Sequence, residues 1–225
     1  MILYRPAGAD DVNFIAEAIT ESDKSGTDIL SYARLFGLSD VDAQVLIKKA
    51  VRENIPGQEL CLSGFLIAMI GNEPSGAVCS WLEAEDGIPS SVLKANILYY
   101  FLGKNFTEKS KGKSVIVDSL AIQREAGCLQ IESVYVRNKF RGMGVSNNLI
   151  LEQIKQNIFS GKVFSKVQIQ LMETNTAALK SYDKLGFKTR LRKTSEHPEV
   201  LNYFPSRTKI MMELSVQDLV KKGLI

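Results

Sequence analysis

The fold of this chain is decided by the stretch Val134-Tyr-Val-Arg-Asn-Lys-Phe-Arg-Gly-Met-Gly-Val-Ser146. It continues an apolar strand that begins at Leu129, and apolar residues spaced as on one helix face follow from Ile150. Between strand and helix, Gly142 and Gly144 let the backbone approach a ligand with its N–H groups turned outward. A helix N-terminus adds positive potential. The stretch therefore predicts an anion site, and a tight turn with basic surface residues is the alternative.

The residues around these glycines exclude two common nucleotide-binding motifs. A Walker A loop requires a following Gly-Lys-Ser/Thr, which is absent, and a dinucleotide fingerprint requires glycine or alanine where Asn147 stands. Arg137, Lys139 and Arg141 surround the loop, so a diphosphate fits the predicted site well. A nucleotide-binding protein of another fold stays open only as a lesser alternative.

A second informative segment runs from Glu173 to Phe187. Thr174 or Asn175 can cap a helix there, and Gly186 stops it. Tyr182 lies on the apolar face of this helix. Taken alone, the segment is equally typical of a helix with a core tyrosine.

Elsewhere the sequence alternates strand and helix signals. It predicts strands at 2–4, 65–70, 77–82, 129–136, 166–172, 187–191 and 210–214, and helices near 12–25, 27–36, 40–53, 92–102, 150–158 and 175–185. The turn-rich link before residue 77 predicts an antiparallel hairpin. This order of elements predicts a mixed α/β sheet.

Together, the two segments resemble the acyl-CoA-binding core of the GNAT superfamily of N-acetyltransferases. Arg141 and Gly144 match the family loop Gln/Arg-x-x-Gly-x-Gly/Ala, whose last position is Ser146 here. The stretch from Asn175 matches Asn-x-x-Ala-x-x-x-Tyr-x-x-x-Gly-Phe. The resemblance covers about residues 128–190.

This resemblance implies a GNAT-like acyl-CoA N-acyltransferase fold and a single domain over residues 1–225. The acetyl-CoA-binding core would be 128–215. The half 1–127 would carry insertions at 27–60 and 84–127, the latter a helical insertion between strands 3 and 4. These insertions would shape the acceptor pocket, because the family places its variation there.

The resemblance also implies residue roles around acetyl-CoA, the expected co-substrate. Backbone groups of Val134 and Val136 would pair with the pantetheine arm in a gap between two strands. Asn175 would hydrogen-bond the arm, and Tyr182 would protonate the departing sulfur. The expected cofactor-binding residues are Val134, Val136, Arg141, Gly142, Met143, Gly144, Val145, Ser146, Asn175, Ala178 and Tyr182.

Acyl transfer to an amine also needs a base, because a primary amine is mostly protonated at neutral pH. Glu132 is the candidate: it stands two and four residues before Val134 and Val136 and is expected to share their strand face. An ion pair with a nearby Lys or Arg is its alternative role. Glu83 is a second candidate base or an ammonium anchor, and His197 is a further candidate base.

The acceptor is predicted less sharply. Trp81 and Tyr135 could wall its pocket, although both are typical core residues. Glu83, Glu85 and Asp86 indicate a small cationic molecule such as a polyamine, an amino acid or an aminoglycoside, and a protein amine stays open. With no evident nucleophile for a ping-pong route, direct transfer in a ternary complex is expected.

Two other functions stay open. A non-catalytic acyl-CoA-binding regulator would keep Gly142, Gly144 and Asn175 but would need neither Tyr182 nor a base. An enzyme using a longer acyl-CoA would share every motif. Many relatives form dimers, so a homodimer is open too, although nothing in the sequence marks its interface.

Composition excludes several other classes of protein. A hydrophobic content of 45% and a charged content of 24% are ordinary for a globular protein, and no run of 18 apolar residues appears. We expect a cytoplasmic protein without a membrane partner. A net charge of +3 is too small to indicate nucleic acid. Residues 128–225 nevertheless carry +8 and residues 1–127 carry −5, which suits an anionic ligand in the second half.

Cysteine and histidine usage predicts neither disulfides nor a metal site. Cys61, Cys79 and Cys128 are widely spaced in apolar segments, which favours free buried thiols. With a single histidine, no zinc-ligand spacing is present.

Overall fold

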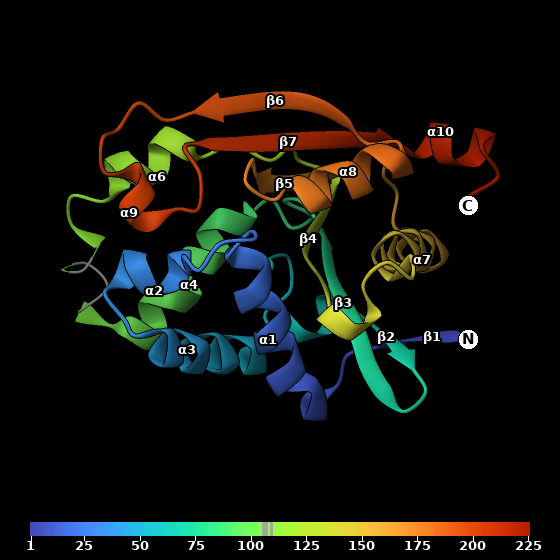
Figure 1. Cartoon of the computed structure of the whole chain (residues 1–225), viewed down its shortest axis with the longest axis horizontal. Coiled ribbons are helices and arrows are strands. Elements are labelled where there is room, and N and C mark those ends of the chain that lie inside the picture. Colours follow the sequence, from blue (N-terminus) through green and yellow to red (C-terminus); the bar gives the residue numbers. More distant parts are fainter. Residues whose placement is uncertain (105–107, 109) are drawn as a thin grey trace.

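The structure is a computed structural model that describes residues 1–104, 108 and 110–225. Within these residues the strands form one seven-stranded sheet in the order β1-β2-β3-β4-β5-β7-β6 (Figure 1). The strands are β1 (Ile2–Pro6), β2 (Phe65–Ile70), β3 (Glu73–Leu82), β4 (Leu129–Val136), β5 (Lys166–Met172), β6 (Lys188–Thr194) and β7 (Thr208–Ser215). The helices are α1 (Val12–Asp23), α2 (Ser31–Phe36), α3 (Asp40–Glu53), α4 (Ser90–Leu102), α6 (Ser114–Leu120), α7 (Val145–Phe159), α8 (Thr176–Leu185), α9 (Val200–Tyr203) and α10 (Val216–Lys221), with short 3-10 turns η1 (Ala9–Asp11), η2 (Leu62–Gly64) and η3 (Asn138–Phe140).

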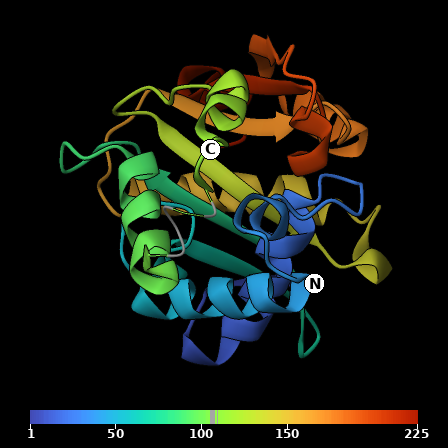
Figure 2. The same cartoon turned by 90° about the vertical axis from the view of Figure 1, so that its left-hand side faces the viewer.

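Helices cover both faces of the sheet. Strand β2 shows the arrangement, because Phe65 and Ile67 pack with α1, α3 and α4 whereas Leu66 and Ala68 pack with α7 and α8. Figure 1 shows these two groups of helices on opposite sides, and Figure 2 shows α3 and α4 lying in front of the strands. Burial on both faces explains why β2 is apolar at every position.

Local capping fixes the ends of two predicted helices. The Ser39 hydroxyl accepts a hydrogen bond from the Asp42 N–H at 3.1 Å, so α3 begins where predicted. The Asn175 side chain accepts from the Ala178 N–H at 3.2 Å and caps α8. Gly186 ends α8 with a φ of 112°.

The predicted mixed sheet and the principal helices are confirmed. The bounds of β4 and β5 match the predicted ranges 129–136 and 166–172. Strand β6 begins one residue later than predicted and is longer, and the short helices α6, α9 and α10 were not predicted. Helices of four to seven residues contain too few turns to show a helical period.

The contact between β4 and β5 is short. These strands are parallel, and their pairing covers Leu129, Gln130 and Ile131 opposite Val167–Ile169. Every other neighbouring pair in the sheet is antiparallel. Beyond Ile131, β4 pairs with β3 and no longer with β5 among the described residues, so an edge of β4 opens toward β5.

A bulge in β4 lies directly beyond that point. Cys79 of β3 faces Glu132 and Ala77 faces Tyr135, so two β4 residues lie opposite one β3 residue. Ser133 within the bulge has a φ of 52°, which is unusual for a residue other than glycine. The bulge turns the end of β4 away from the regular sheet.

Two predictions from composition can also be compared with the structure. All three cysteines are free and buried, as predicted. Among the described helices, none has the length and apolar character needed to cross a membrane.

Candidate functional site

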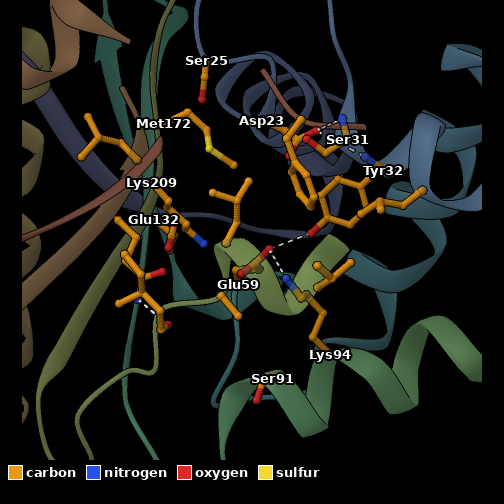
Figure 3. Close-up of a pocket in the computed structure, with 18 of the residues that line it drawn as sticks. Asp23, Ser25, Ser31, Tyr32, Glu59, Ser91, Lys94, Glu132, Met172 and Lys209 are labelled. Atoms are coloured by element: carbon orange, nitrogen blue, oxygen red, sulfur yellow. Dashed lines mark hydrogen bonds and ion pairs between the residues drawn. The ribbon is translucent and has the colours of Figure 1, made fainter. Parts of the chain in front are cut away.

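A cavity of about 600 Å³ lies where β4 and β5 separate, and we call it the β4–β5 cavity. Its wall includes residues from α1, α2, α4, α6, β4, β5, α8 and β7. Figure 3 shows polar side chains from several of these elements pointing inward among apolar ones. The principal charged and hydrogen-bonding groups on the wall are Asp23, Tyr32, Glu59, Lys94, Arg124, Glu132, Tyr182 and Lys209.

Glu59 is the centre of a buried polar network. Its carboxylate accepts from the Tyr32 hydroxyl at 2.7 Å and from Lys94 Nζ at 3.1 Å, and Arg124 lies 3.7 Å away. Burial disfavours the charged form, but the charges of Lys94 and Arg124 outweigh burial and lower the pKa of Glu59 to about 2. Glu59 is therefore a fixed negative charge.

Glu132 is held on one side by Arg124. Arg124 Nη2 donates to Glu132 Oε1 at 2.6 Å, so the ion-pair alternative considered for Glu132 is confirmed. Its other oxygen, Oε2, has no hydrogen bond to any described residue. Burial and the nearby Glu59 raise the pKa of Glu132 despite Arg124, which makes it a stronger base than an exposed glutamate.

Asp23 joins the end of α1 to the start of α2. Its Oδ2 accepts from the backbone N–H groups of Ser31 at 2.5 Å and Tyr32 at 3.4 Å. Burial raises the pKa of Asp23 to about 6, although these two hydrogen bonds oppose the shift. Asp23 thus both orders the cavity wall and changes charge near neutral pH.

Tyr182 of α8 and Asn175, which caps α8, both line the cavity. Tyr182 is buried, and its ring centroid lies 5.9 Å from that of Phe187. Burial, with a contribution from the charge of Glu132, raises the pKa of Tyr182 above its ordinary value of 10.0. The hydroxyl therefore stays protonated at neutral pH and can donate a proton. Tyr182 is therefore both a core tyrosine and a cavity residue, because its ring packs against Phe187 while the residue lines the cavity.

The predicted anion loop is exposed and rests on glycine geometry. Gly142 and Gly144 have φ values of 81° and 75°, and a Cβ at 142 would meet no atom within 4 Å. Backbone conformation, rather than crowding, therefore requires glycine there. Gly144 caps α7. Arg141 Nε donates to the Val136 carbonyl at 3.1 Å, which ties the loop to the end of β4.

The three cations predicted around the loop are not equivalent. Arg137 binds both Glu17 oxygens, at 3.1 and 2.8 Å, and Lys139 is paired with Glu73. Arg141 is exposed and has no carboxylate partner within the described part of the chain. Arg141 is consequently the loop cation that can meet a ligand without first losing an ion pair.

The other predicted cofactor residues surround these groups. Met143 is exposed, Val145 is buried at the start of α7, and Ala178 is partly buried on α8. The Ser146 and Ser181 hydroxyls are 3.2 Å apart, which links α7 to α8. The Val134 carbonyl lies 3.4 Å from the Ser22 hydroxyl.

The expected common face of Glu132, Val134 and Val136 is wrong. Ile131, Val134 and Val136 all pack toward α7 and α8, so Glu132, next to Ile131, lies on the opposite face. The extra residue in the β4 bulge reverses the alternation. Glu132 nevertheless reaches the cavity, because the cavity passes through the gap beside β4.

The candidate acceptor residues Trp81, Glu83 and Tyr135 do not line the cavity. Glu83 accepts from Trp81 Nε1 at 2.8 Å and from the Ser90 N–H at 2.9 Å, so it caps α4. Trp81 lies behind Arg124, whose guanidinium is 5.2 Å from the ring centroid.

The other acceptor and base candidates are also engaged elsewhere. The Tyr135 hydroxyl donates to Glu17 at 2.9 Å. Glu85 lies 3.6 Å from Lys162. His197 Nδ1 accepts from the Glu199 N–H at 3.2 Å in a loop away from the cavity wall.

Several cavity residues were missed in the sequence, namely Asp23, Tyr32, Glu59, Lys94, Arg124 and Lys209. Most come from segments that match no motif. Charged residues flanked by apolar ones, such as Arg124 after Ile122 and Lys209 before Ile210, were the available signal. Within the described ranges, no cluster of His, Cys, Asp and Glu could hold a metal ion.

A family model described as "Acetyltransferase (GNAT) family" matches residues 48–187. The chain belongs to this GNAT family. It is therefore an acyltransferase, and acetyl transfer is the activity that the family name gives. No curated protein sequence matches the chain.

Solved structures share the GNAT fold. An N-acetyltransferase from Staphylococcus aureus Mu50 has a TM-score of 0.64 at 18% identity, covering 94% of this chain and 100% of its own. The acetyltransferase yncA from Salmonella typhimurium, solved with acetyl-CoA, has a TM-score of 0.55 at 14% identity, covering 96% and 94%. An aminoglycoside acetyltransferase in complex with coenzyme A and kanamycin has a TM-score of 0.54 at 15% identity, covering 99% of both chains. At these identities the likeness concerns the fold.

Proposed function

We propose that this GNAT protein transfers an acetyl group from acetyl-CoA to a primary amine by direct attack in a ternary complex. One observation carries the proposal: β4 leaves β5 after Ile131 and runs directly into the exposed loop Arg141–Gly144. A strand edge for an extended arm is thereby continuous with an anion site. Tyr182 lines the cavity at the same gap.

The residues present fit acetyl-CoA. The N–H groups from Gly142 to Ser146, together with Arg141, would hold the diphosphate. Backbone groups of Val134 and Val136 would pair with the pantetheine arm, and Asn175 would hydrogen-bond it. The Ser22 hydroxyl near the Val134 carbonyl would have to turn away if that carbonyl pairs with the arm.

The reaction can be balanced with residues of this chain. Glu132 Oε2 accepts a proton from the acceptor ammonium, which frees the nitrogen lone pair. A new N–C bond forms to the acetyl carbonyl while the C–S bond breaks. A backbone N–H near Val136 stabilises the oxygen charge, and Tyr182 donates its proton to the departing sulfur. The products are an N-acetylated amine and the free thiol of CoA.

The complexes of the structural neighbours support this assignment of the co-substrate. One neighbour was solved with acetyl-CoA and another with coenzyme A and an aminoglycoside. A small amine is therefore the acceptor we propose, in preference to a protein amine.

Calorimetric titration with acetyl-CoA, using ATP as the control, tests the cofactor site first. We expect micromolar binding of acetyl-CoA and none of ATP, followed by thiol release when amines are added. Tighter binding and faster turnover with longer acyl-CoAs would reassign the donor. Binding with no turnover of any amine would favour the regulatory alternative, and absence of acyl-CoA binding by folded protein would refute the proposal.

A further inference from the structure

Lys209 is a cation on the cavity wall without a protein partner. It lies on β7 opposite Met172 of β5. Its Nζ forms no hydrogen bond or ion pair with any residue that the structure describes. The neighbouring cations differ: Lys94 is paired with Glu59 at 3.1 Å, and Arg124 with Glu132 at 2.6 Å.

Burial makes this unpaired charge costly. Desolvation, reinforced by the nearby charges of Arg124 and Lys94, lowers the pKa of Lys209 from 10.5 to about 8. The ammonium form still predominates at neutral pH. An anion that entered the cavity would therefore be paired by a charge that has already lost much of its hydration.

A carboxylate with one oxygen free of hydrogen bonds to the described residues lines the same wall as Lys209. Glu132 keeps Oε2 free while Arg124 holds Oε1. Lys209, Glu132 and Tyr182 all line the same cavity. The charge of Glu132 acts on the ionisation of the other two groups. Figure 3 shows Lys209 and Glu132 on the same part of the wall, with Glu59 and Lys94 facing them.

These two groups are complementary to an ammonium and a carboxylate that are attached to the same carbon atom. We propose that the acceptor is an α-amino acid, whose carboxylate pairs with Lys209 while its amino group lies against Glu132. This inference rests on the proposed acetyl transfer and specifies its acceptor. It narrows the cationic acceptor predicted from sequence, because the acidic residues Glu83 and Glu85 lie outside the cavity.

The rest of the wall favours an apolar side chain on this amino acid. Beyond the charged cluster, the wall carries several serines and a group of apolar side chains, namely Ile19, Leu35, Phe36, Leu98, Val117 and Phe204. Two of the acidic groups that a second ammonium would need are already engaged: Glu59 is held by Lys94 and Tyr32, and Asp23 accepts from two N–H groups of α2. A third, Asp118 of α6, lies on the wall with an exposed side chain. An amino acid with one charge of each sign therefore fits better than a diamine.

Matched acceptor pairs that differ by one carboxylate test the proposal. The pairs are phenylalanine and phenethylamine, leucine and isoamylamine, and arginine and agmatine, each assayed by thiol release from acetyl-CoA. We expect kcat/KM to be at least about tenfold higher for the amino acid in the two apolar pairs, a factor that corresponds to about 1.4 kcal/mol. A preference for the decarboxylated amines would overturn the proposal.

The variant Lys209→Met assigns the preference to one side chain. It should lower kcat/KM for phenylalanine at least about tenfold and change that for phenethylamine less than about threefold. Lys209→Arg should retain most of the preference, because it keeps a cation. Lys188→Met is the matched control, since Lys188 lies on β6 with an exposed side chain paired with Asp183. Within one variant, the ratio of kcat/KM for the amino acid to kcat/KM for its amine does not depend on how much of the sample is folded.

The outcomes separate this inference from the proposed function. If acetyl-CoA does not bind, the proposed function itself fails. If acetyl-CoA binds but neither member of any pair is acetylated, or Lys209→Met lowers both members equally, the amino-acid inference fails and the cofactor site stands.

Discussion

The glycine loop and the β4–β5 cavity would present different chemical groups to a ligand. The loop Arg141–Gly144 is exposed, and its predicted donors are backbone N–H groups positioned by two residues with positive φ. The cavity is a partly open hollow, and its polar groups are side chains from several separate elements. If the loop binds a diphosphate as proposed, its backbone conformation would determine binding. In the cavity, the charges depend on one another, because Arg124 is paired with both Glu59 and Glu132.

The largest loss of stability is expected when the cation shared by Glu59 and Glu132 is removed. Arg124→Met leaves Glu59 and Glu132 without their shared cation, and we expect it to lower the free energy of unfolding by about 3–5 kcal/mol. Urea unfolding measures this value. Arg141→Met on the exposed loop is the comparison and should cost under about 1 kcal/mol. Equal losses in the two variants would remove the distinction between the regions.

Tyr182→Phe should separate chemistry from binding. Removing the proton donor is expected to lower kcat about 100-fold, while acetyl-CoA affinity stays unchanged. Steady-state thiol release and calorimetry measure the two quantities. Tyr4→Phe makes the same change at a partly buried tyrosine that packs against the same core but lies outside the cavity, and it should leave kcat within about threefold. A full-rate Tyr182→Phe enzyme would show that the sulfur receives its proton from elsewhere.

Gly144→Val tests whether the loop works through its backbone. Valine strongly resists a φ of 75°, so the loop should change conformation and acetyl-CoA affinity should fall at least about tenfold. Gly161→Val introduces valine at a φ of 86° just after α7, where a Cβ would meet nothing within 4 Å. This control should lose stability but keep its affinity. Unchanged affinity in Gly144→Val would mean that side chains dominate in the loop as well.

The smallest effect concerns Asp23 and pH. Its pKa is raised from 3.8 to about 6, so the folded state binds more protons than the unfolded state between these values. This contribution favours folding below pH 3.8 and is lost as the pH rises through about 6. Such a shift corresponds to about 3 kcal/mol when complete, and partial solvent access reduces our expectation to about 1 kcal/mol.

Asp23→Asn removes the titrating charge and keeps an oxygen for the N–H groups of α2. We expect the stability of this variant relative to the original protein to increase by about 1 kcal/mol between pH 4 and pH 7. The charges of Lys94 and Glu59 also affect the pKa of Asp23. Both residues are present in the variant and in the original protein. A stability difference that does not vary with pH would show that Asp23 keeps its ordinary ionisation in the folded state.

How far the sequence predicts the structure depends on whether a feature is local. Ser39 and Asn175 cap helices through residues three positions away, and the glycines of the loop mark a local conformation, so these features were predictable. The mixed α/β sheet was predictable from the order of the elements and from the family resemblance.

The bulge and the cavity were not predictable in this way. Ser133 adopts positive φ although nothing in its own chemistry requires it, and one unpredicted residue was enough to put Glu132 on the opposite face from Val134. Arg124 and Lys209 have no sequence motif. Their roles arise from long-range packing that brings an irregular segment and a late strand to the same wall.

The short junction between β4 and β5 has a mechanical consequence. The strands on either side, β1 to β4 and β5 to β7, form two antiparallel ribbons that meet in the sheet through Leu129, Gln130 and Ile131. An elongated ligand lying in the gap would contact both ribbons and hold them together. Its binding energy would be added to the unfolding free energy, and amide exchange in β4 beyond Ile131 would slow on binding. The melting temperature of the protein would then rise with the concentration of acetyl-CoA, because the proposed co-substrate would bind in this gap.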